Sequence, residues 1–256
     1  MNDLLAGKTV LVAGLYSQSS IAFEVARIAQ EQGAAVILSS FGRRMKVAAA
    51  IAKRLPKTAP VVEFDATEEQ DVGALSDRIR EYADSLDGIA HCISSSYPEV
   101  MGDRFLDASW DEVAHSFQVS AYSYKSLVSA SLGLLNPGAS VVGCTVDSES
   151  AWRIYGWAGV AKGAYASINQ YLALHLGPHG IRTNLVAAGP VDTTTMRSIE
   201  GIEDIDSLWE QRAPLAWDRS TAVPTAKAVT ALLSDWFPMT TGEVLHVDGG
   251  FHAVAY

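Results

Sequence analysis

A tyrosine and a lysine stand close together in the stretch Tyr155-Gly-Trp-Ala-Gly-Val-Ala-Lys162. Residues at this spacing lie about two turns apart on one helix face, so the pattern predicts a phenol and an ammonium side by side. A phenol can donate a proton, and a fixed cation beside it can hold a cofactor hydroxyl and stabilise a developing enolate or alkoxide. The same spacing also occurs where a half-buried ring and a solvated charge do no chemistry.

Around this pair, short apolar runs alternate regularly with longer helical patterns along the chain. Predicted strands span residues 9–13, 35–39, 61–64, 88–93, 140–144, 181–186 and 243–247, and predicted helices span 21–32, 43–54, 68–84, 110–134 and about 155–179. Apolar runs without alternation suit strands that helices cover on both faces. We therefore predict one α/β domain over residues 1–256, a doubly wound parallel sheet of about seven strands with helices on both faces.

Composition limits the class of protein. The chain has 256 residues, of which 48% are apolar and 19% charged. This proportion supports a sizeable core and argues against extended disorder. The formal net charge of −10 argues against a nucleic-acid partner or an anionic membrane surface, because both require clustered Lys and Arg.

The cysteines and histidines do not have the spacing of metal ligands, so we predict no metal site. Cys92 and Cys144 lie in apolar runs near predicted strand ends and are expected to be buried free thiols. The N-terminus lacks the apolar stretch of a signal peptide, and no window reaches about 18 uninterrupted apolar residues. We expect no membrane span and a cytoplasmic location.

The turn after the first predicted strand is suited to binding an anion. Gly14 lets the backbone turn, and Ser17, Ser19 and Ser20 can cap the following helix and donate to phosphate oxygens. In open α/β sheets, ligands bind beyond the carboxyl ends of the strands, where this turn is expected. A serine-rich helix cap without any phosphate contact remains the alternative.

The end of the second predicted strand would address the ribose of a dinucleotide. An acid there favours NADH, but this segment has no acid and instead carries Arg43 and Arg44. Either guanidinium could pair with a 2′-phosphate, which favours NADPH slightly, or both could simply face solvent. Asp65, just past the third strand, could accept from an adenine amino group or cap the next helix.

Several collinear runs resemble the short-chain dehydrogenase/reductases, and within them the divergent enoyl-acyl-carrier-protein reductases, especially the mycobacterial group of mycolic-acid synthesis. The six residues between Tyr155 and Lys162 are typical of this divergent group, and ordinary members have a shorter spacing. The resemblance implies a Rossmann-type fold. Its most specific runs are Ser19-Ser-Ile-Ala-Phe23, Ala29-Gln-Glu-Gln-Gly-Ala34, Ser120-Ala-Tyr-Ser-Tyr124, Asn136-Pro-Gly138, Asn184-Leu-Val-Ala-Ala-Gly-Pro190, Gln211-Arg-Ala-Pro214, Ala231-Leu-Leu-Ser-Asp-Trp236 and Asp248-Gly-Gly250.

The resemblance implies roles for the matched positions. Lys162 would bind the nicotinamide ribose hydroxyls, and Tyr155 would hydrogen-bond the thioester carbonyl of the substrate. The remaining cofactor contacts that it implies, by region, are Gly14, Ser20 and Ile21 at the pyrophosphate and ribose, Phe41 and Asp65 at the adenosine, and Gly189, Pro190, Val191 and Thr193 at the nicotinamide side. Further predicted cofactor contacts are Arg43, Ala66 and Ser94.

Two departures from the family pattern point to a more polar pocket. The strand before the active-site loop ends in a Gly-aromatic pair in the resembled enzymes, whereas this chain has Ser94-Ser95-Ser96. The aromatic ring that flanks the substrate in typical members is missing around Val146. Thr145, 17 residues before Lys162, occupies the offset at which carbonyl-reducing members place a catalytic serine. Its hydroxyl could polarise a ketone or imine together with Tyr155, or could only cap the end of a strand.

Residues 193–212 correspond to the segment that closes over the acyl chain in the resembled family. Here the segment is acidic and shorter than its mycobacterial counterpart, which argues against very long aliphatic substrates. It is expected to be a substrate lid, although a mobile surface helix would have the same composition.

The leading hypothesis is therefore an NAD(P)H-dependent reductase of an enoyl thioester, free or carried on an acyl carrier protein. Hydride transfer to Cβ would generate an enolate that Tyr155 and Lys162 stabilise. The alternative is a ketone or imine reductase, or an alcohol dehydrogenase, of a specialised pathway with the same fold. A cofactor-binding sensor without turnover is a third reading, which the intact Tyr155 and Lys162 disfavour. A homo-oligomer, tetramer or dimer, is expected.

Overall fold

Seven parallel strands form one sheet in the order β3-β2-β1-β4-β5-β6-β7. The computed structural model describes residues 3–199 and 201–255, apart from the side chains of residues 198, 203 and 206. The predicted doubly wound sheet is confirmed. Its strands are β1 (Thr9–Ala13), β2 (Ala35–Ser40), β3 (Val61–Glu63), β4 (Leu86–His91), β5 (Leu135–Thr145), β6 (Arg182–Ala188) and β7 (Val244–Val247).

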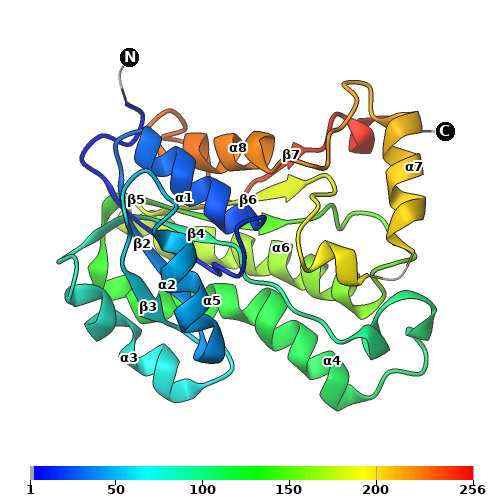
Figure 1. The fold of residues 1–256 in the computed structure, drawn as a ribbon, viewed down its shortest axis with the longest axis horizontal. Coiled ribbons are helices and arrows are strands. Elements are labelled where there is room, and N and C mark those ends of the chain that lie inside the picture. Colours follow the sequence, from blue (N-terminus) through cyan, green and yellow to red (C-terminus); the bar gives the residue numbers. More distant parts are fainter. Residues whose placement is uncertain (1–2, 200, 256) are drawn as a thin grey trace.

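Helices cover both faces of this sheet (Figure 1). Their bounds are α1 (Ile21–Glu31), α2 (Met45–Ala52), α3 (Glu69–Arg80), α4 (Trp110–Phe117), α5 (Ser123–Ser131), α6 (Trp157–Leu176), α7 (Ile202–Arg212) and α8 (Val223–Leu233). One core lies between the sheet and α1, α2 and α8, and a second core lies between the sheet and α3, α5 and α6. In the view of Figure 1, α1 and α8 lie above the sheet and α3, α4 and α5 below it.

The alternation of side chains along each strand explains the two cores. In β1, Val10 and Val12 face the first core, whereas Leu11 and Ala13 face the second. All four are completely buried, as expected of a strand covered on both sides. No helix of the described residues is long and apolar enough to cross a membrane.

The predicted helix over residues 110–134 is interrupted. A π-helical segment, Gln118–Tyr122, separates α4 from α5. Such segments shift the helix face by one residue and are frequent at functional sites. Here the shift places the buried Ser120 against the loop that follows β4.

The sequence prediction for the helix that carries the tyrosine and the lysine is wrong at its start. α6 begins at Trp157, so Tyr155 lies in the turn before the helix and does not share a helix face with Lys162. The cause is Gly156, whose φ of 50° and ψ of −126° are incompatible with a helix. A Cβ at this position would lie 2.7 Å from the carbonyl oxygen of Val100, so only glycine fits.

Candidate active site

The strand order reverses between β1 and β4, and open α/β sheets bind ligands beyond the carboxyl ends of the strands at this point. Gly14 follows β1 there, with a φ of +99°. A Cβ on Gly14 would lie 2.6 Å from the carbonyl oxygen of Cys92, the residue after β4. The two loops therefore pack backbone to backbone, which leaves main-chain surface open to a ligand.

Ser20 is the N-cap of α1. Its hydroxyl accepts from the backbone N–H of Phe23 at 3.3 Å and donates to the carbonyl of Ser17 at 2.7 Å. The predicted capping role is confirmed, whereas phosphate binding stays a prediction. Thr194, from the loop after β6, contacts the hydroxyl of Ser17 at 3.4 Å, so the loops after β1 and β6 meet beside the start of α1. Ile21 is the first residue of α1.

The arginines predicted for the adenosine end occupy different environments. Phe41 and Arg43 are exposed. The guanidinium of Arg44 lies 3.8 Å from the ring centroid of Tyr16 and donates to the hydroxyl of the same residue. Arg43 is thus available to a ligand, and Arg44 is held by Tyr16.

An acidic side chain that the sequence reasoning missed lies at the same end. Glu63, the last residue of β3, accepts a hydrogen bond from the backbone N–H of Gly42 at 3.1 Å. Gly42 lies just after the end of β2. Folds of this kind bind the ribose of a dinucleotide at the end of this strand. The sequence prediction considered an acid only at the end of the second strand, whereas Glu63 comes from the neighbouring strand β3.

Asp65 caps a turn rather than a helix. Its Oδ1 accepts from the backbone N–H of Thr67 at 2.9 Å and from the Thr67 hydroxyl at 2.7 Å. The N-cap position of α3 belongs to Glu68. Ala66 is half-buried beside this turn, and an adenine contact for either residue stays a prediction.

The loop after β6 is tightly packed. A Cβ on Gly189 would lie 2.8 Å from the ring of Trp217, and the indole N–H of Trp217 donates to the carbonyl of Pro190 at 2.6 Å. Val191 is buried. The hydroxyl of Thr193 accepts from the backbone N–H of Met196 at 3.1 Å and so caps the turn that starts the predicted lid.

Lys162 is buried in α6, with only 8% of its surface exposed. Its ammonium lies 5.1 Å from the ring centroid of Tyr165, and no described residue accepts a hydrogen bond from it. Burial lowers the pKa of Lys162 to about 8. The ammonium is therefore still mostly charged at neutral pH.

A buried polar network holds Tyr165 beneath this lysine. Tyr165 bonds His91 Nδ1 at 2.7 Å, and His91 Nε2 bonds the hydroxyl of Ser123 at 2.8 Å. Burial lowers the pKa of His91 to about 3, so the imidazole is neutral. His91 is therefore a hydrogen-bonded core histidine. Gly143 leaves room for this arrangement, since a Cβ there would lie 2.0 Å from the Tyr165 oxygen.

The two thiols are free, as predicted. Cys92 Sγ and Cys144 Sγ lie 3.6 Å apart across the ends of β4 and β5. The contact with the Cys144 thiol and then burial raise the pKa of Cys92, so it is protonated at neutral pH. Thr145, at the end of β5, is buried and its hydroxyl contacts the carbonyl of Val146 at 3.3 Å, which is the strand-cap arrangement.

The serine cluster after β4 is tied to the interrupted helix. Ser120 accepts from the backbone N–H of Ser95 at 3.0 Å and donates to its carbonyl at 2.7 Å, while its oxygen lies 3.2 Å from the hydroxyl of Ser94. Ser116 donates to Ser96 at 2.8 Å. Hydroxyl contacts therefore fix the serine cluster.

Tyr155 lies on the wall of a small cavity of about 10 Å³. The phenol is half-buried, and this environment raises its pKa to about 12. It is therefore a neutral hydrogen-bond donor at neutral pH. The other residues that line the cavity are Val146, Asp147, Trp152, Ala187, Ala188, Pro190, Trp209, His246 and Asp248.

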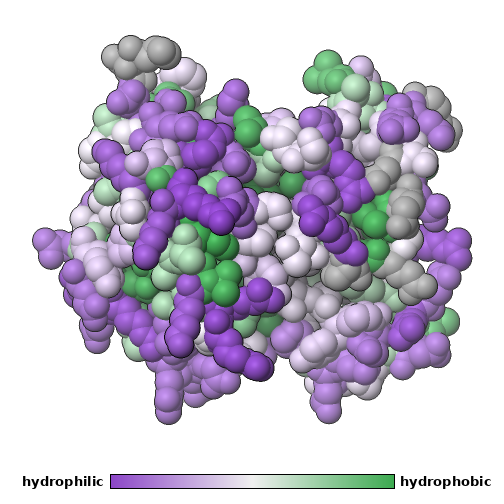
Figure 2. Space-filling model, viewed as in Figure 1, coloured by the Kyte–Doolittle hydropathy of each residue, from purple (hydrophilic) through white to green (hydrophobic). Residues whose placement is uncertain are grey.

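The predicted lid contains α7, and this helix is docked on the site rather than extended into solvent. Trp209 of α7 stacks on Phe251 with ring centroids 3.9 Å apart and on Trp152 at 5.4 Å. A larger cavity of about 400 Å³ lies beside this stack. Figure 2 shows a mostly hydrophilic face with a paler hollow between the side of α1 and α2 and the side of α7.

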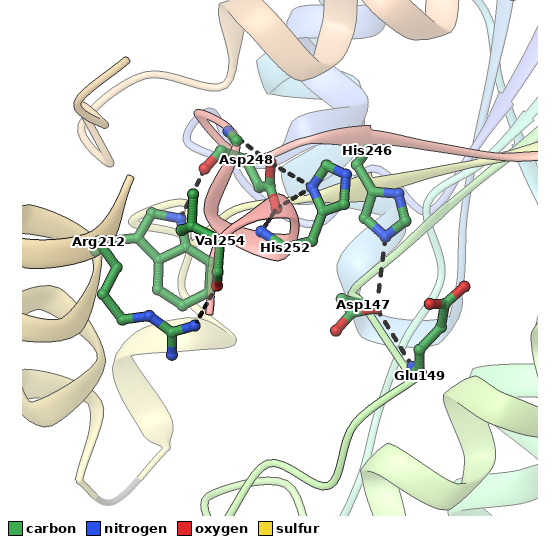
Figure 3. A network of polar contacts seen from close by, with 9 residues as sticks. Asp147, Glu149, Arg212, His246, Asp248, His252 and Val254 are labelled. Carbon is green, nitrogen blue, oxygen red and sulfur yellow. Dashed lines mark hydrogen bonds and ion pairs between the residues drawn. The ribbon is translucent and has the colours of Figure 1, made fainter. Parts of the chain in front are cut away.

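A network of two aspartates and two histidines borders both cavities (Figure 3). His246 Nε2 lies 3.4 Å from Asp147 Oδ1, and His252 Nδ1 lies 2.9 Å from Asp248 Oδ2. The two imidazoles stack with centroids 3.9 Å apart. Sequence reasoning missed this network, because its members come from the loop after β5 and from the C-terminal segment and form no local motif.

Comparisons with known proteins cover nearly the whole chain. A family model described as Enoyl-(Acyl carrier protein) reductase matches residues 14–252. The chain is 42% identical to the enoyl-[acyl-carrier-protein] reductase [NADH] of Mycolicibacterium smegmatis, with 98% of each chain covered. It is 41% identical to the protein of the same description from Mycobacterium avium, again with 98% of each chain covered. The enoyl-[acyl-carrier-protein] reductase [NADPH] of Staphylococcus aureus is 31% identical over 98% of each chain.

Proposed function

Because this chain belongs to the family of enoyl-acyl-carrier-protein reductases, we propose that it reduces the carbon–carbon double bond of an enoyl thioester with a nicotinamide cofactor. The resemblance predicted from the sequence runs is confirmed. The observation that carries the proposal is the buried ammonium of Lys162, which has no oxygen partner among the described residues and interacts with Cys92 and Cys144 at the ends of β4 and β5.

The residues present fit a dinucleotide. Gly14 and Gly189 both stand where a Cβ would collide with neighbouring atoms at 2.6 and 2.8 Å, so both positions require glycine. Ser20, the cap of α1, would hold the pyrophosphate, and Lys162 would hold the nicotinamide ribose hydroxyls. When bound, the reduced nicotinamide would supply a hydride to Cβ of the substrate.

The protein's own contribution to the reaction is to stabilise the oxyanion. The neutral phenol of Tyr155, with its pKa raised to about 12, donates a hydrogen bond to the thioester carbonyl oxygen. This hydrogen bond strengthens as the enolate develops, because the acceptor gains negative charge. The charge of Lys162 favours the same oxyanion. Solvent then protonates Cα.

The direct test of the function is nicotinamide oxidation with enoyl thioesters. Purified protein is mixed with NADH and crotonyl or longer enoyl thioesters, and the loss of nicotinamide absorbance is followed. We expect turnover of thioesters and none of small ketones of similar size. Turnover of ketones alone would refute the proposal, since the protein would then reduce carbonyl groups and not carbon–carbon double bonds.

We propose NADH as the cofactor, although Arg43 and Arg44 predicted a slight preference for NADPH. The two mycobacterial relatives at 42% and 41% identity carry the NADH description, and the relative named for NADPH is 31% identical. Glu63 supports the proposal physically, since its carboxylate at Gly42 would repel a 2′-phosphate and can accept from a free ribose hydroxyl.

We expect kcat/KM to be at least about tenfold higher with NADH than with NADPH, because the carboxylate of Glu63 discriminates by charge. Glu63→Gln should lower the ratio of kcat/KM with NADH to kcat/KM with NADPH, mainly by lowering the KM for NADPH. Glu69→Gln on α3 changes the formal charge equally and serves as the control. A ratio that is the same in Glu63→Gln and in the unchanged protein would rule out this carboxylate as the discriminating group.

A homo-oligomer is also part of the proposal. α6 presents Val160, Tyr171 and Leu174 to solvent, and the last two are more than 60% exposed. Large apolar side chains on one helix are costly to leave in water, and association with a second copy would cover them.

A further inference from the structure

The wall between the two cavities contains a hydrogen-bond acceptor without a full set of partners. In Asp147, Oδ1 takes both contacts that the described residues make, from His246 Nε2 at 3.4 Å and from the backbone N–H of Glu149 at 3.3 Å. Figure 3 shows both dashed lines ending on this one oxygen. Oδ2 has no donor among the described residues, although the side chain is only 16% exposed.

A hydrogen-bond donor without a partner lies on the same wall. The indole N–H of Trp152 is buried and has no acceptor among the described residues. Trp152 and Asp147 both line the small cavity that contains Tyr155, and both also line the cavity of about 400 Å³. Buried polar groups without partners are rare and costly, so the Trp152 N–H calls for a ligand or a water molecule. Asp147 Oδ2 is not fully buried and can accept a hydrogen bond from a ligand or from solvent.

The position of this wall relates it to the substrate. Tyr155 lines only the small cavity, whereas Asp147 and Trp152 line both, so these two residues lie between Tyr155 and the larger cavity. The larger cavity has the volume of a small-molecule site. Its lining is mixed, with Ile205 and Phe251 beside charged groups such as Arg153, which suits a short polar chain better than a long aliphatic one.

We propose that Asp147 and Trp152 determine specificity by binding a hydroxyl group on the acyl chain of the substrate, close to the double bond. A hydroxyl is both donor and acceptor, so it can donate to Asp147 Oδ2 and accept from the Trp152 indole N–H at once. His246 holds the carboxylate from its other side, and His252 with Asp248 supports His246 by stacking. The inference rests on the proposed enoyl-thioester reduction and deepens it.

The test compares two substrates of nearly equal shape, the 4-hydroxybut-2-enoyl and pent-2-enoyl thioesters, which differ by a hydroxyl in place of a methyl group. We expect the unchanged protein to prefer the hydroxylated substrate by at least about tenfold in kcat/KM. The methyl group of the other substrate would leave Asp147 and Trp152 without hydrogen-bond partners, which weakens binding. The preference should appear mainly in KM, because these contacts form in the ground state.

Variants then assign the preference to the two side chains. Asp147→Ala should bring the ratio to about one, and Trp152→Phe, which keeps the ring stack and removes the N–H, should reduce it about threefold to tenfold. Asp147→Asn keeps a hydrogen-bond acceptor and should retain part of the preference for the hydroxylated substrate. Asp71→Ala is the matched control, since Asp71 is also ion-paired and 17% exposed but lines neither cavity. NADH binding, followed by fluorescence, confirms that each variant is folded.

The possible results are distinguishable. Equal rates with both substrates in the unchanged protein would overturn the specificity proposal and leave the proposed function standing. A preference that survives in Asp147→Ala and Trp152→Phe would show that other residues bind the hydroxyl, which also overturns it. Failure to reduce either thioester would instead refute the proposed function on which the inference rests.

Discussion

Replacement of Lys162 by methionine is expected to lower kcat/KM for an enoyl thioester by about 10²–10⁴-fold, the range for removal of a fixed charge or proton-transfer group from a reacting centre. Methionine has a similar length and suits a buried position, so the fold should persist. The loss should appear both in kcat, through the oxyanion, and in the affinity for NADH, through the ribose hydroxyls. Steady-state kinetics and fluorescence titration with NADH measure the two effects separately.

The same residue predicts a pH dependence. Burial lowers the pKa of Lys162 to about 8, so the ammonium is charged below this pH and neutral above it. Activity should therefore fall as the pH rises through about 8, by up to tenfold per unit. Lys162→Arg, whose guanidinium stays charged to above pH 12, should shift this decline to higher pH even if its activity is lower.

An exposed lysine provides the control for both experiments. Lys125→Met on α5 removes one positive charge from the surface and should leave the rate and its pH profile unchanged. If Lys162→Met kept more than about a tenth of the activity, or if the decline above pH 8 persisted unchanged in Lys162→Arg, the proposed role of this ammonium would be wrong.

Most of the fold could be predicted, because buried strands and amphipathic helices leave local patterns in the sequence. The run over β1 has no polar residue after Thr9 and is buried on both faces. The helix start at Trp157 was predicted two residues too early, since spacing alone does not reveal that Gly156 adopts a left-handed φ against the backbone of Val100.

The cofactor end and the substrate end differ in how far the sequence could predict them. Gly14 forms the turn after β1 and Ser20 caps α1, and both features follow from a local motif; cofactor contacts for them stay a prediction. Asp147 and His246 are 99 residues apart and meet only because β5 and β7 end at the same edge of the sheet. A single sequence carries no signal for such a pair, and the network that borders the two cavities became apparent only in three dimensions.

Removal of the phenolic hydroxyl in Tyr155→Phe is expected to reduce kcat by about 10²–10³-fold with little change in NADH affinity, since one oxyanion donor is lost and the ring is kept. The pKa of about 12 means that this donor is neutral across the working range. The loss should therefore have the same size at pH 6 and pH 8. Initial rates at both pH values, with saturating NADH, measure it.

Thr145→Val decides whether Tyr155 acts on a thioester or on a ketone. In the thioester mechanism the hydroxyl of Thr145 is only a strand cap at the carbonyl of Val146, so this variant should stay within about threefold of the unchanged protein. In a carbonyl reductase the two hydroxyls would polarise the same oxygen, and Thr145→Val would lose about as much as Tyr155→Phe. The two variants therefore separate the mechanisms by the bond reduced, because only the ketone reaction makes both hydroxyls essential.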